Sequence, residues 1–534
     1  MSTGRTLARN TAFNGAGRLW DGVVSLLLTA YIVRTLGTSQ FGLWGVATAL
    51  TGYAGVLDLG AGSAFAKYIA EHAERREDDQ VSAIVSTGLA IYLALGVVFV
   101  ALAWLALDGL LALAANARGD LAGDFADAAV RADLKYLVRG GILLFAAANC
   151  VSAFTAVQTG LQRMGVTNAL SFGASWVKVI ATVALLENGF GVRGLVLAHA
   201  CVLAAFAVGS IAAAFVLWPR LRVSPARISR AAAGRLLSFG WRAQVARLAH
   251  LIMFETDVLV IALILRDMQL AGVYKIGLDL ANKMRQLPSI LLSAVLPAAS
   301  AINARGDRER LLRLYLTASR YVAAAVVPVA LFLAGGAYLT LRAWIGPQID
   351  LRDSAIVLQI MAIGYIANML PGAGVAVALG AGRPDLQMKS GLISMSSNLF
   401  LTIVLALTVG FWGVPVATAC SMLISWVWFS TRIGRLLDVP LREYARRVIV
   451  WPVLSALPGA AVCAAASEWY FRDAGRWGSF AAICGAVAVG LAAYLLIMRR
   501  APVFDQSDIA FFRRELHLDL VPGFTWWARG VRTG

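Results

Sequence analysis

The sequence predicts an all-α polytopic membrane protein with about 14 transmembrane helices. Hydrophobic residues make up 59% of the 534 positions and charged residues only 14%. Soluble domains average about 45–50% apolar and about 25% charged residues. The mean hydropathy is +0.73. Apolar runs of about 20 residues, the length that crosses a hydrocarbon core of about 30 Å, recur along the chain. Most of the chain is therefore expected to lie in lipid.

These runs divide into two sets of six and a final pair. The first set lies near 13–35, 41–62, 82–107, 138–160, 166–187 and 193–217. The second set lies near 241–265, 272–297, 317–340, 355–379, 389–409 and 412–431, and the final pair lies near 448–466 and 479–498. We therefore expect an N-terminal lobe, a cytoplasmic linker, a C-terminal lobe, two last spans and a cytoplasmic tail, with the boundaries 1–218, 219–240, 241–431, 432–498 and 499–534.

The composition of the loops supports these boundaries. The segment that follows Pro219 is basic and separates the two lobes, and a second basic segment, Arg432–Arg447, sets off the last two spans. The tail after Arg499 carries Phe and Trp residues among arginines, a pattern typical of a segment that lies on a membrane surface. The run near 13–35 has no cleavage site after it, so we expect it to be kept as the first helix.

The distribution of Lys and Arg predicts the orientation. With the N-terminus inside and the tail left out, the inner segments hold 22 Lys and Arg residues and the outer segments hold 11. Cytoplasmic loops of membrane proteins carry an excess of these residues. Both termini are therefore expected in the cytoplasm. The formal net charge of +17 first suggests nucleic acid as a partner. Because the basic residues lie in short loops between apolar runs, we expect no nucleic-acid partner.

No pattern of residues predicts a catalytic, metal or cofactor site. The five cysteines all lie in apolar runs at spacings that match neither a metal site nor a disulfide framework. The sequence has no phosphate-binding Walker loop, and its glycines match no dinucleotide fingerprint. We therefore expect no cofactor and no enzymatic activity.

Two short segments resemble each other and support a two-lobe design. Ser39–Trp44 opens the second predicted span, and Gln269–Tyr274 opens the eighth, each one span into its lobe. Both contain a Gly followed two residues later by an aromatic residue. Many secondary transporters are built from internal repeats of this kind, with the substrate near the interface between the repeats.

Three segments near the N-terminus carry a family resemblance. Arg34–Trp44 resembles the first outer turn of bacterial polysaccharide flippases, and Leu57–Gly60 and Lys67–Glu71 resemble the segments after that turn in the same family. These flippases, which serve O-antigen and exopolysaccharide synthesis, belong to the multidrug, oligosaccharidyl-lipid and polysaccharide exporter superfamily. The resemblance implies a V-shaped pair of lobes, alternating access, and a location in the bacterial inner membrane.

The resemblance also implies a cargo and partners. The cargo would be an oligosaccharide on polyprenyl pyrophosphate, moved from the inner to the outer leaflet for the synthesis of lipopolysaccharide or another surface polysaccharide. Membrane lipids, a polysaccharide polymerase and glycosyltransferases would be partners. A pyrophosphate is an anion, so basic side chains inside the membrane are the candidates to bind it.

Charged residues within apolar spans are costly unless they face a cavity or a partner. Arg18 and Asp21 lie three apart in the first span and share a helix face. Arg18 is a candidate to meet pyrophosphate at the inner mouth of a cavity, with Asp21 balancing its charge. The alternative is that the two residues neutralise each other near the membrane interface.

The eighth span carries the most informative charges. Lys275, Asp279 and Lys283 recur every four residues, and Arg285 follows, so they form one polar stripe on an apolar helix. Asp279 can pair fully with only one lysine, which leaves net positive charge. We expect the stripe to line a cavity, with Lys283 and Arg285 deepest. The alternative is that the lysines extend toward the two membrane surfaces.

Three further polar residues lie within apolar spans. Asp257 is deep in the seventh span, where it could exchange a proton or cation, or form a structural salt bridge. Lys178 is a lone cation in the fifth span, and either lines the same cavity or bonds to backbone carbonyls. His199, flanked by apolar residues, is expected to be a satisfied core histidine.

Three other functions remain open. A cation-coupled multidrug exporter of the same superfamily would need an acidic or aromatic cavity, whereas the charges in spans one, five and eight are mainly basic. A membrane glycan polymerase or ligase would need a large outer loop with functional Arg and His, and the outer loop from Asp108 to Lys135 has no His. A peptidoglycan-precursor flippase would differ from a polysaccharide flippase only in its substrate.

Overall fold

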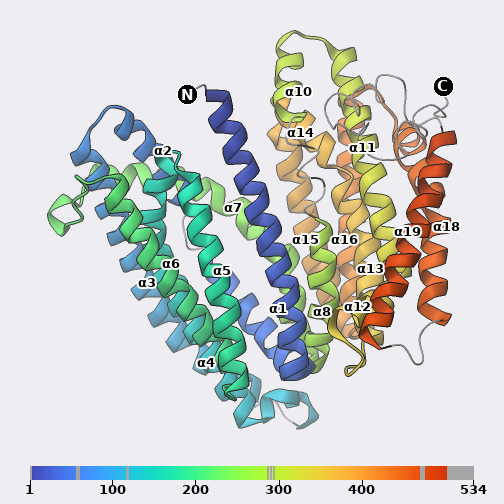
Figure 1. Cartoon of the computed structure of the whole chain (residues 1–534), viewed down its shortest axis with the longest axis horizontal. Coiled ribbons are helices and arrows are strands. Elements are labelled where there is room, and N and C mark those ends of the chain that lie inside the picture. Colours follow the sequence, from blue (N-terminus) through green and yellow to red (C-terminus); the bar gives the residue numbers. More distant parts are fainter. Residues whose placement is uncertain are drawn as a thin grey trace. The chain divides into compact units, whose positions relative to one another are not determined.

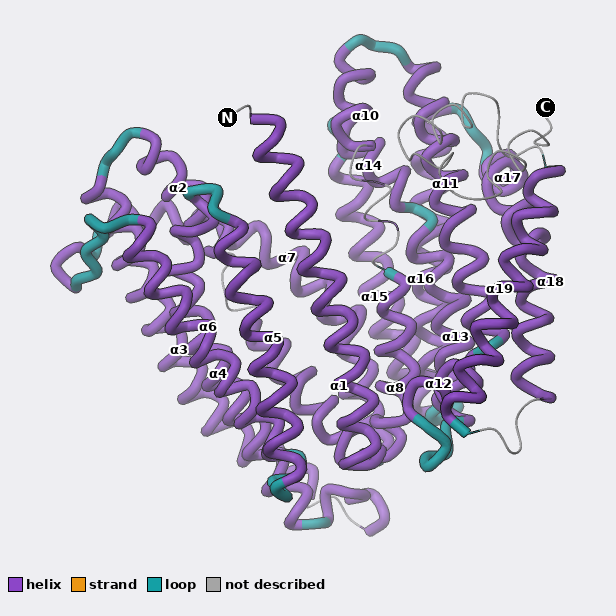
Figure 2. The backbone as a smooth tube through the Cα atoms, in the orientation of Figure 1, coloured by secondary structure: helices purple, strands orange, loops and turns teal. Residues whose placement is uncertain are grey.

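Helices form all the regular structure in the described part of the chain (Figure 1, Figure 2). The computed structural model describes residues 3–55, 61–115, 119–285, 288, 292, 295–469 and 475–501. By its packing the chain divides into two units, Met1–Gly272 and Val273–Gly534. The helix α8 (Met268–Met284) begins in the first unit and continues into the second.

The first unit contains seven helices before α8 in the described residues. They are α1 (Thr3–Ala54), α2 (Ala61–Glu74), α3 (Asp78–Ala115), α4 (Ala128–Gly160), α5 (Met164–Glu187), α6 (Arg193–Leu217) and α7 (Arg230–Val260). Short helical turns lie at Gly119–Ala126, Pro225–Arg227 and Ile261–Leu265. The side chains of Asp127 and Ser229 cap α4 and α7, because their oxygens accept from the backbone N–H groups of Ala129 and Ala232 at 2.7 and 3.4 Å.

The second unit contains the remaining described helices. They are α10 (Val295–Ala304), α11 (Arg308–Gly335), α12 (Ala337–Ile345), α13 (Arg352–Met369), α14 (Gly372–Gly380), α15 (Pro384–Thr408), α16 (Gly413–Leu437), α17 (Leu441–Tyr444), α18 (Val450–Trp469) and α19 (Arg476–Arg500), with a π-helical turn at Ala445–Ile449. The helices α18 and α19 pack on each other and on α11 and α12. Gly459 and Gly490 allow close contact between α18 and α19, since an added Cβ on either would lie 2.9 Å from the other's Cα.

Eleven described segments are long and apolar enough to cross a membrane. Each of them corresponds to one of the 14 predicted spans, so eleven predicted spans are matched. In this count α1 stands for the first predicted span only, and α13 and α14 together form one segment. The other three predicted spans fall on the second part of α1, on α7 and its π-helical turn, and on α8 with α10. The prediction of an all-α, multi-pass membrane protein is confirmed.

A single glycine separates the first two predicted spans. Gly37 has φ 79° and ψ 173° and interrupts the helical backbone inside α1. This positive φ is accessible to glycine and strained for other residues. The first part of α1 therefore ends near Leu36 and the second begins near Thr38, which matches the predicted division between 13–35 and 41–62.

The two glycines of the predicted repeat lie at one helix crossing in the first unit. A Cβ on Gly42 would lie 1.8 Å from the backbone oxygen of Met268, and a Cβ on Gly272 would lie 2.0 Å from that of Thr38. Only glycine permits backbones to approach this closely. The matching positions of the two segments thus serve the same packing role.

Hydrogen bonds and ion pairs hold the segment between Pro219 and Ser229 against α3. Hydroxyl oxygens of Ser82, Ser86 and Thr87 accept hydrogen bonds from the backbone N–H groups of Arg222, Ser224 and Ser229 at 3.1, 3.2 and 2.9 Å. Ion pairs join Arg220 to Asp78 at 3.0 Å and Arg227 to Asp79 at 2.6 Å. These contacts fix the start of α7 within the first unit.

The packing division lies one helix later than the predicted linker. Because α7 packs on α1, α2 and α3, the structure groups it with the first unit and places the division after Gly272. The predicted lobes, 1–218 and 241–431, were drawn from the apolar runs and the basic linker, and they stay a prediction. The predicted tail, 499–534, lies almost wholly outside the described residues.

Candidate functional site

A cavity of about 610 Å³ lies inside the first unit, among the second part of α1 and the helices α4, α5 and α6. Its walls are largely apolar and aromatic, and include Trp44, Leu137, Leu144, Phe145, Leu203 and Phe206. Ligand sites are commonly cavities of about 300–1,000 Å³ with apolar walls and a few polar groups. This cavity is the strongest candidate for a binding site among the described residues of the first unit.

Lys178 brings a positive charge into this cavity. It lies on α5 with Ser171 and Ser175, and all three line the cavity. Their spacing of four and three residues places them on one face of the helix. Lys178 is half-buried. The structure therefore places Lys178 on the wall of a cavity in the first unit. That this cavity is shared with the charges of α8, and that Lys178 binds substrate, stay predictions.

His199 lies across the same cavity, on α6. Its Nδ1 is 2.7 Å from the backbone oxygen of Leu195, and its ring centroid is 5.3 Å from that of Trp44. Because a carbonyl oxygen only accepts, Nδ1 carries the proton in the neutral ring. The histidine is hydrogen-bonded, as the sequence suggested, but it is exposed on the cavity wall and not in the core. The expectation of a core histidine was wrong in that respect.

Asp21 lies at the edge of the cavity. Its Oδ1 accepts a hydrogen bond of 2.8 Å from the hydroxyl of Ser175, a cavity residue, and its side chain is exposed. The predicted partner, Arg18, belongs to α1, but its side chain lies outside the described residues. The pairing of Arg18 with Asp21 therefore stays a prediction.

The polar stripe of α8 is held by contacts within the second unit. Lys275 Nζ lies 3.0 Å from Asp279 Oδ1, and the two side chains are 17% and 25% exposed. Of the two lysines in the stripe, Lys275 is therefore the one that forms an ion pair with Asp279. Lys283 and Arg285 lie further along the helix and are half-buried. The four residues of the stripe, three cations and one carboxylate, carry a formal net positive charge.

Two residues that the sequence did not single out support this stripe. Tyr365 on α13 donates a hydrogen bond of 2.5 Å from its hydroxyl to Oδ1 of Asn282. The guanidinium of Arg285 lies 6.0 Å from the ring centroid of Tyr365 and 3.5 Å from Asn282 Oδ1. Arg285 is thus positioned by an aromatic ring and an amide. Its proposed binding of phosphate stays a prediction.

Asp257 is almost completely buried on α7, with 1% of its surface exposed. The neighbouring residue, Thr256, lies 2.5 Å from the hydroxyl of Tyr53 on α1. Arg247 and His250 belong to the same helix, but their side chains lie outside the described residues. The structure supports the deep position expected for Asp257, and its exchange of a proton or cation stays a prediction.

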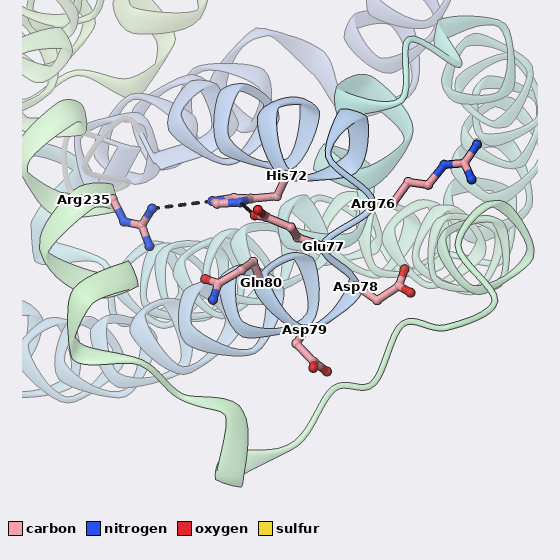
Figure 3. A pocket seen from close by; sticks show the side chains of 7 residues that line it. All are labelled: His72, Arg76, Glu77, Asp78, Asp79, Gln80 and Arg235. Atoms are coloured by element: carbon pink, nitrogen blue, oxygen red, sulfur yellow. Dashed lines mark hydrogen bonds and ion pairs between the residues drawn. The ribbon is translucent and has the colours of Figure 1, made fainter.

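A second pocket, of about 620 Å³, lies where the loop between α2 and α3 meets α7. Figure 3 shows His72 between Glu77 and Arg235. His72 Nδ1 lies 2.5 Å from Glu77 Oε2, and its Nε2 lies 3.5 Å from Arg235. Two other charges of the lining, Asp78 and Asp79, form ion pairs with Arg220 and Arg227 in the segment after Pro219. We interpret this pocket as part of the contacts that hold α7 against α2 and α3.

The described residues contain no group of three or more His, Cys, Asp or Glu side chains that could hold a metal ion. All five cysteines are described, and none of them forms a disulfide. The polar groups that line the cavity of the first unit include the cation of Lys178 and the hydroxyls of Ser171 and Ser175. Such a set can bind an anion through charge and hydrogen bonds.

The comparison with protein families decides the family. The model of the family described as "Polysaccharide biosynthesis protein" matches residues 7–303, which is more than half of the chain. The chain belongs to this family. The match includes the segments that carried the resemblance in the sequence and the cavity of the first unit. A search of curated proteins finds no match.

Solved structures show which fold this polysaccharide biosynthesis protein shares. "Lipid II flippase MurJ, inward closed conformation" aligns with a TM-score of 0.68 and 14% identity over 95% of this chain and 100% of that chain. A structure described as an inward-facing multidrug resistance MATE family transporter of the MOP superfamily aligns with a TM-score of 0.54 and 15% identity, over 78% of this chain and 99% of that chain. The predicted family and the all-α membrane fold class are confirmed.

Proposed function

We propose that this chain is a flippase that moves an oligosaccharide on polyprenyl pyrophosphate across the bacterial inner membrane by alternating access. The observation that carries the proposal is the cavity of the first unit, where Lys178 is set in apolar and aromatic walls. Membership of a family described by polysaccharide biosynthesis supports a glycan as part of the cargo. We further propose that both termini face the cytoplasm, where glycosyltransferases supply the cargo, and that a polymerase uses it outside.

The chemistry of the cargo requires fixed cations. A pyrophosphate is anionic, and hydrocarbon cannot solvate it. Attraction between opposite charges is several-fold stronger in a partly desolvated site than in bulk water at the same distance, because the effective dielectric is lower. Lys178 can supply this attraction in the first unit. Lys283 and Arg285 can supply it in the second unit, and Lys275 remains paired with Asp279.

We propose a role in the transport cycle for each of the other charged candidate residues. Arg18 would receive the pyrophosphate at the inner mouth, with Asp21 beside it. Asp279 limits the positive charge of the empty stripe through its pair with Lys275. Asp257 would exchange a proton or cation as access changes. The cargo must bind the two access states with different strengths, because a ligand that binds both equally shifts neither.

Two functions from the same superfamily remain as alternatives. A cation-coupled multidrug exporter would bind cationic drugs, and a lysine in the cavity disfavours that charge. A peptidoglycan-precursor flippase would use the same cations, since its cargo is also a lipid pyrophosphate. The sugar part of the cargo therefore separates it from a polysaccharide flippase.

Deletion of the gene tests the proposed function in the cell. We expect the deletion strain to lack a surface polysaccharide and to accumulate its lipid-linked oligosaccharide on the cytoplasmic leaflet, because synthesis continues while translocation stops. Surface glycan staining and extraction of lipid-linked sugars measure both. A plasmid copy of the gene should restore the glycan. Normal surface glycan together with hypersensitivity to cationic drugs would contradict the proposal and favour the multidrug exporter.

A further inference from the structure

Three aromatic side chains gather between α1 and α5 in the first unit, outside the lining of the cavity. Trp20 lies on α1, and Phe172 and Trp176 lie one turn apart on α5. The ring centroid of Trp20 is 5.1 Å from that of Phe172 and 5.4 Å from that of Trp176. Phe172 and Trp176 are 48% and 47% exposed. The group therefore presents ring surface to its surroundings instead of filling a core.

A carboxylate lies directly beside these rings. Asp21 follows Trp20 in the chain, is exposed, and accepts a hydrogen bond of 2.8 Å from Ser175. An ionised carboxylate facing hydrocarbon would be costly, so charged residues within membrane spans usually face water or a partner. Aromatic residues that only contact lipid or anchor a helix at the interface have no need of this carboxylate. The face that carries the rings is therefore expected to meet a polar ligand.

The carboxylate also connects the rings to the cation of the cavity. Ser175 binds Asp21 and lines the cavity with Lys178, three residues further along α5. Three residues correspond to a rise of about 4.5 Å along a helix. Around the axis of α5, at about 100° per residue, Ser175 with its bound carboxylate lies between Lys178 on the cavity side and the rings of Phe172 and Trp176 on the other side. This order matches a ligand that carries an apolar ring face, hydroxyl groups and a negative charge.

We propose that Trp20, Phe172, Trp176 and Asp21 form a sugar platform that binds the oligosaccharide of the cargo next to its pyrophosphate. This subsite for the glycan rests on the proposed function of the chain as a flippase for a lipid-linked oligosaccharide. A pyranose has a face of C–H groups that packs on aromatic rings, whose electron-rich faces attract them. Its hydroxyls donate hydrogen bonds to a carboxylate, which only accepts when ionised. Lys178 holds the adjoining phosphate.

The test compares two lipids on the purified full-length protein. The first is polyprenyl pyrophosphate with the oligosaccharide that accumulates in the deletion strain, and the second is polyprenyl pyrophosphate without sugar. We expect Trp176→Ala to weaken binding of the first about threefold to tenfold and to leave binding of the second unchanged. Trp176→Phe should keep most of the affinity, because it keeps a ring. Asp21→Asn should weaken binding of the sugar-bearing lipid relative to the lipid without sugar, because it removes the acceptor for the sugar hydroxyls.

A matched control and the remaining outcomes complete the test. Trp477 on α19 is 76% exposed and lies in the other unit, so Trp477→Ala should change neither affinity. Equal losses for both lipids in Trp176→Ala, or a loss that follows a lower melting temperature, would overturn the platform and indicate a packing role. Unchanged affinities for both lipids would overturn it as well. If the wild-type protein binds neither lipid, the proposed function itself fails.

Discussion

Replacing Lys178 by alanine is expected to abolish export of the surface polysaccharide while the protein still folds. Lys178 brings the cationic group to the cavity of the first unit, and its loss would leave the pyrophosphate facing largely apolar walls. A hydrogen bond to a charged group contributes about 1.5–3 kcal/mol. Binding of polyprenyl pyrophosphate should therefore weaken about tenfold to a hundredfold. Lys178→Arg should restore part of the export, because it keeps the charge in a different shape.

The control for this substitution is a lysine of similar chemistry outside the cavity. Lys389 on α15 is exposed and lies 3.5 Å from Asp385 one turn away, so it is part of a surface ion pair. Such pairs contribute little to stability. Lys389→Ala should export at the wild-type rate. Wild-type export by Lys178→Ala would contradict the assignment of Lys178, and a matching fall in folded protein would show that the residue is structural.

Alanine at Lys283 or at Arg285 is expected to abolish surface polysaccharide with the protein abundance unchanged. These two cations follow the Lys275–Asp279 pair on α8 and give the stripe its net positive charge. Without either of them, the second unit would hold the pyrophosphate about tenfold to a hundredfold less tightly. Lys283→Arg should restore part of the activity. Glycan staining and immunoblotting of membranes measure export and abundance.

Tyr365 provides the control for structural effects in the stripe. Tyr365→Phe removes the hydroxyl that binds Asn282 but keeps the ring beside Arg285. Export by this variant should fall less than export by Arg285→Ala. If both alanine variants export normally, or if their loss of export only follows loss of folded protein, then the stripe is structural and takes no part in binding the cargo.

Hydropathy was sufficient to predict the fold class, because lipid imposes long apolar helices on the chain. The order of the helices, the break between the first two spans and the polar face of α8 all followed from local spacing. The point after Gly272 at which the packing divides had no such signal. The packing of α7 on the first unit depends on hydroxyls of α3 that accept from the segment after Pro219, and such contacts leave no periodic signal in the sequence.

Only part of the candidate site could be predicted, because contacts between distant helices leave no local signal in the sequence. Single charges in apolar spans, such as Lys178, stand out in a sequence, and the spacing of Ser171, Ser175 and Lys178 could have revealed the polar face of α5. Other groups form only when helices pack. Trp44 meets His199 across more than a hundred residues of chain, and Trp20 meets Trp176 in the same way.

Reconstitution of the purified protein into liposomes tests the proposed translocation most directly. The liposomes would carry a fluorescent lipid-linked oligosaccharide, extracted from the deletion strain, in both leaflets. A membrane-impermeant quencher or glycosidase reaches only the outer leaflet. With the protein present, we predict that the protected inner fraction becomes accessible, and that Lys178→Ala slows this strongly. If the protected fraction stays constant with folded wild-type protein and an imposed ion gradient in either direction, the chain is not a flippase for this cargo.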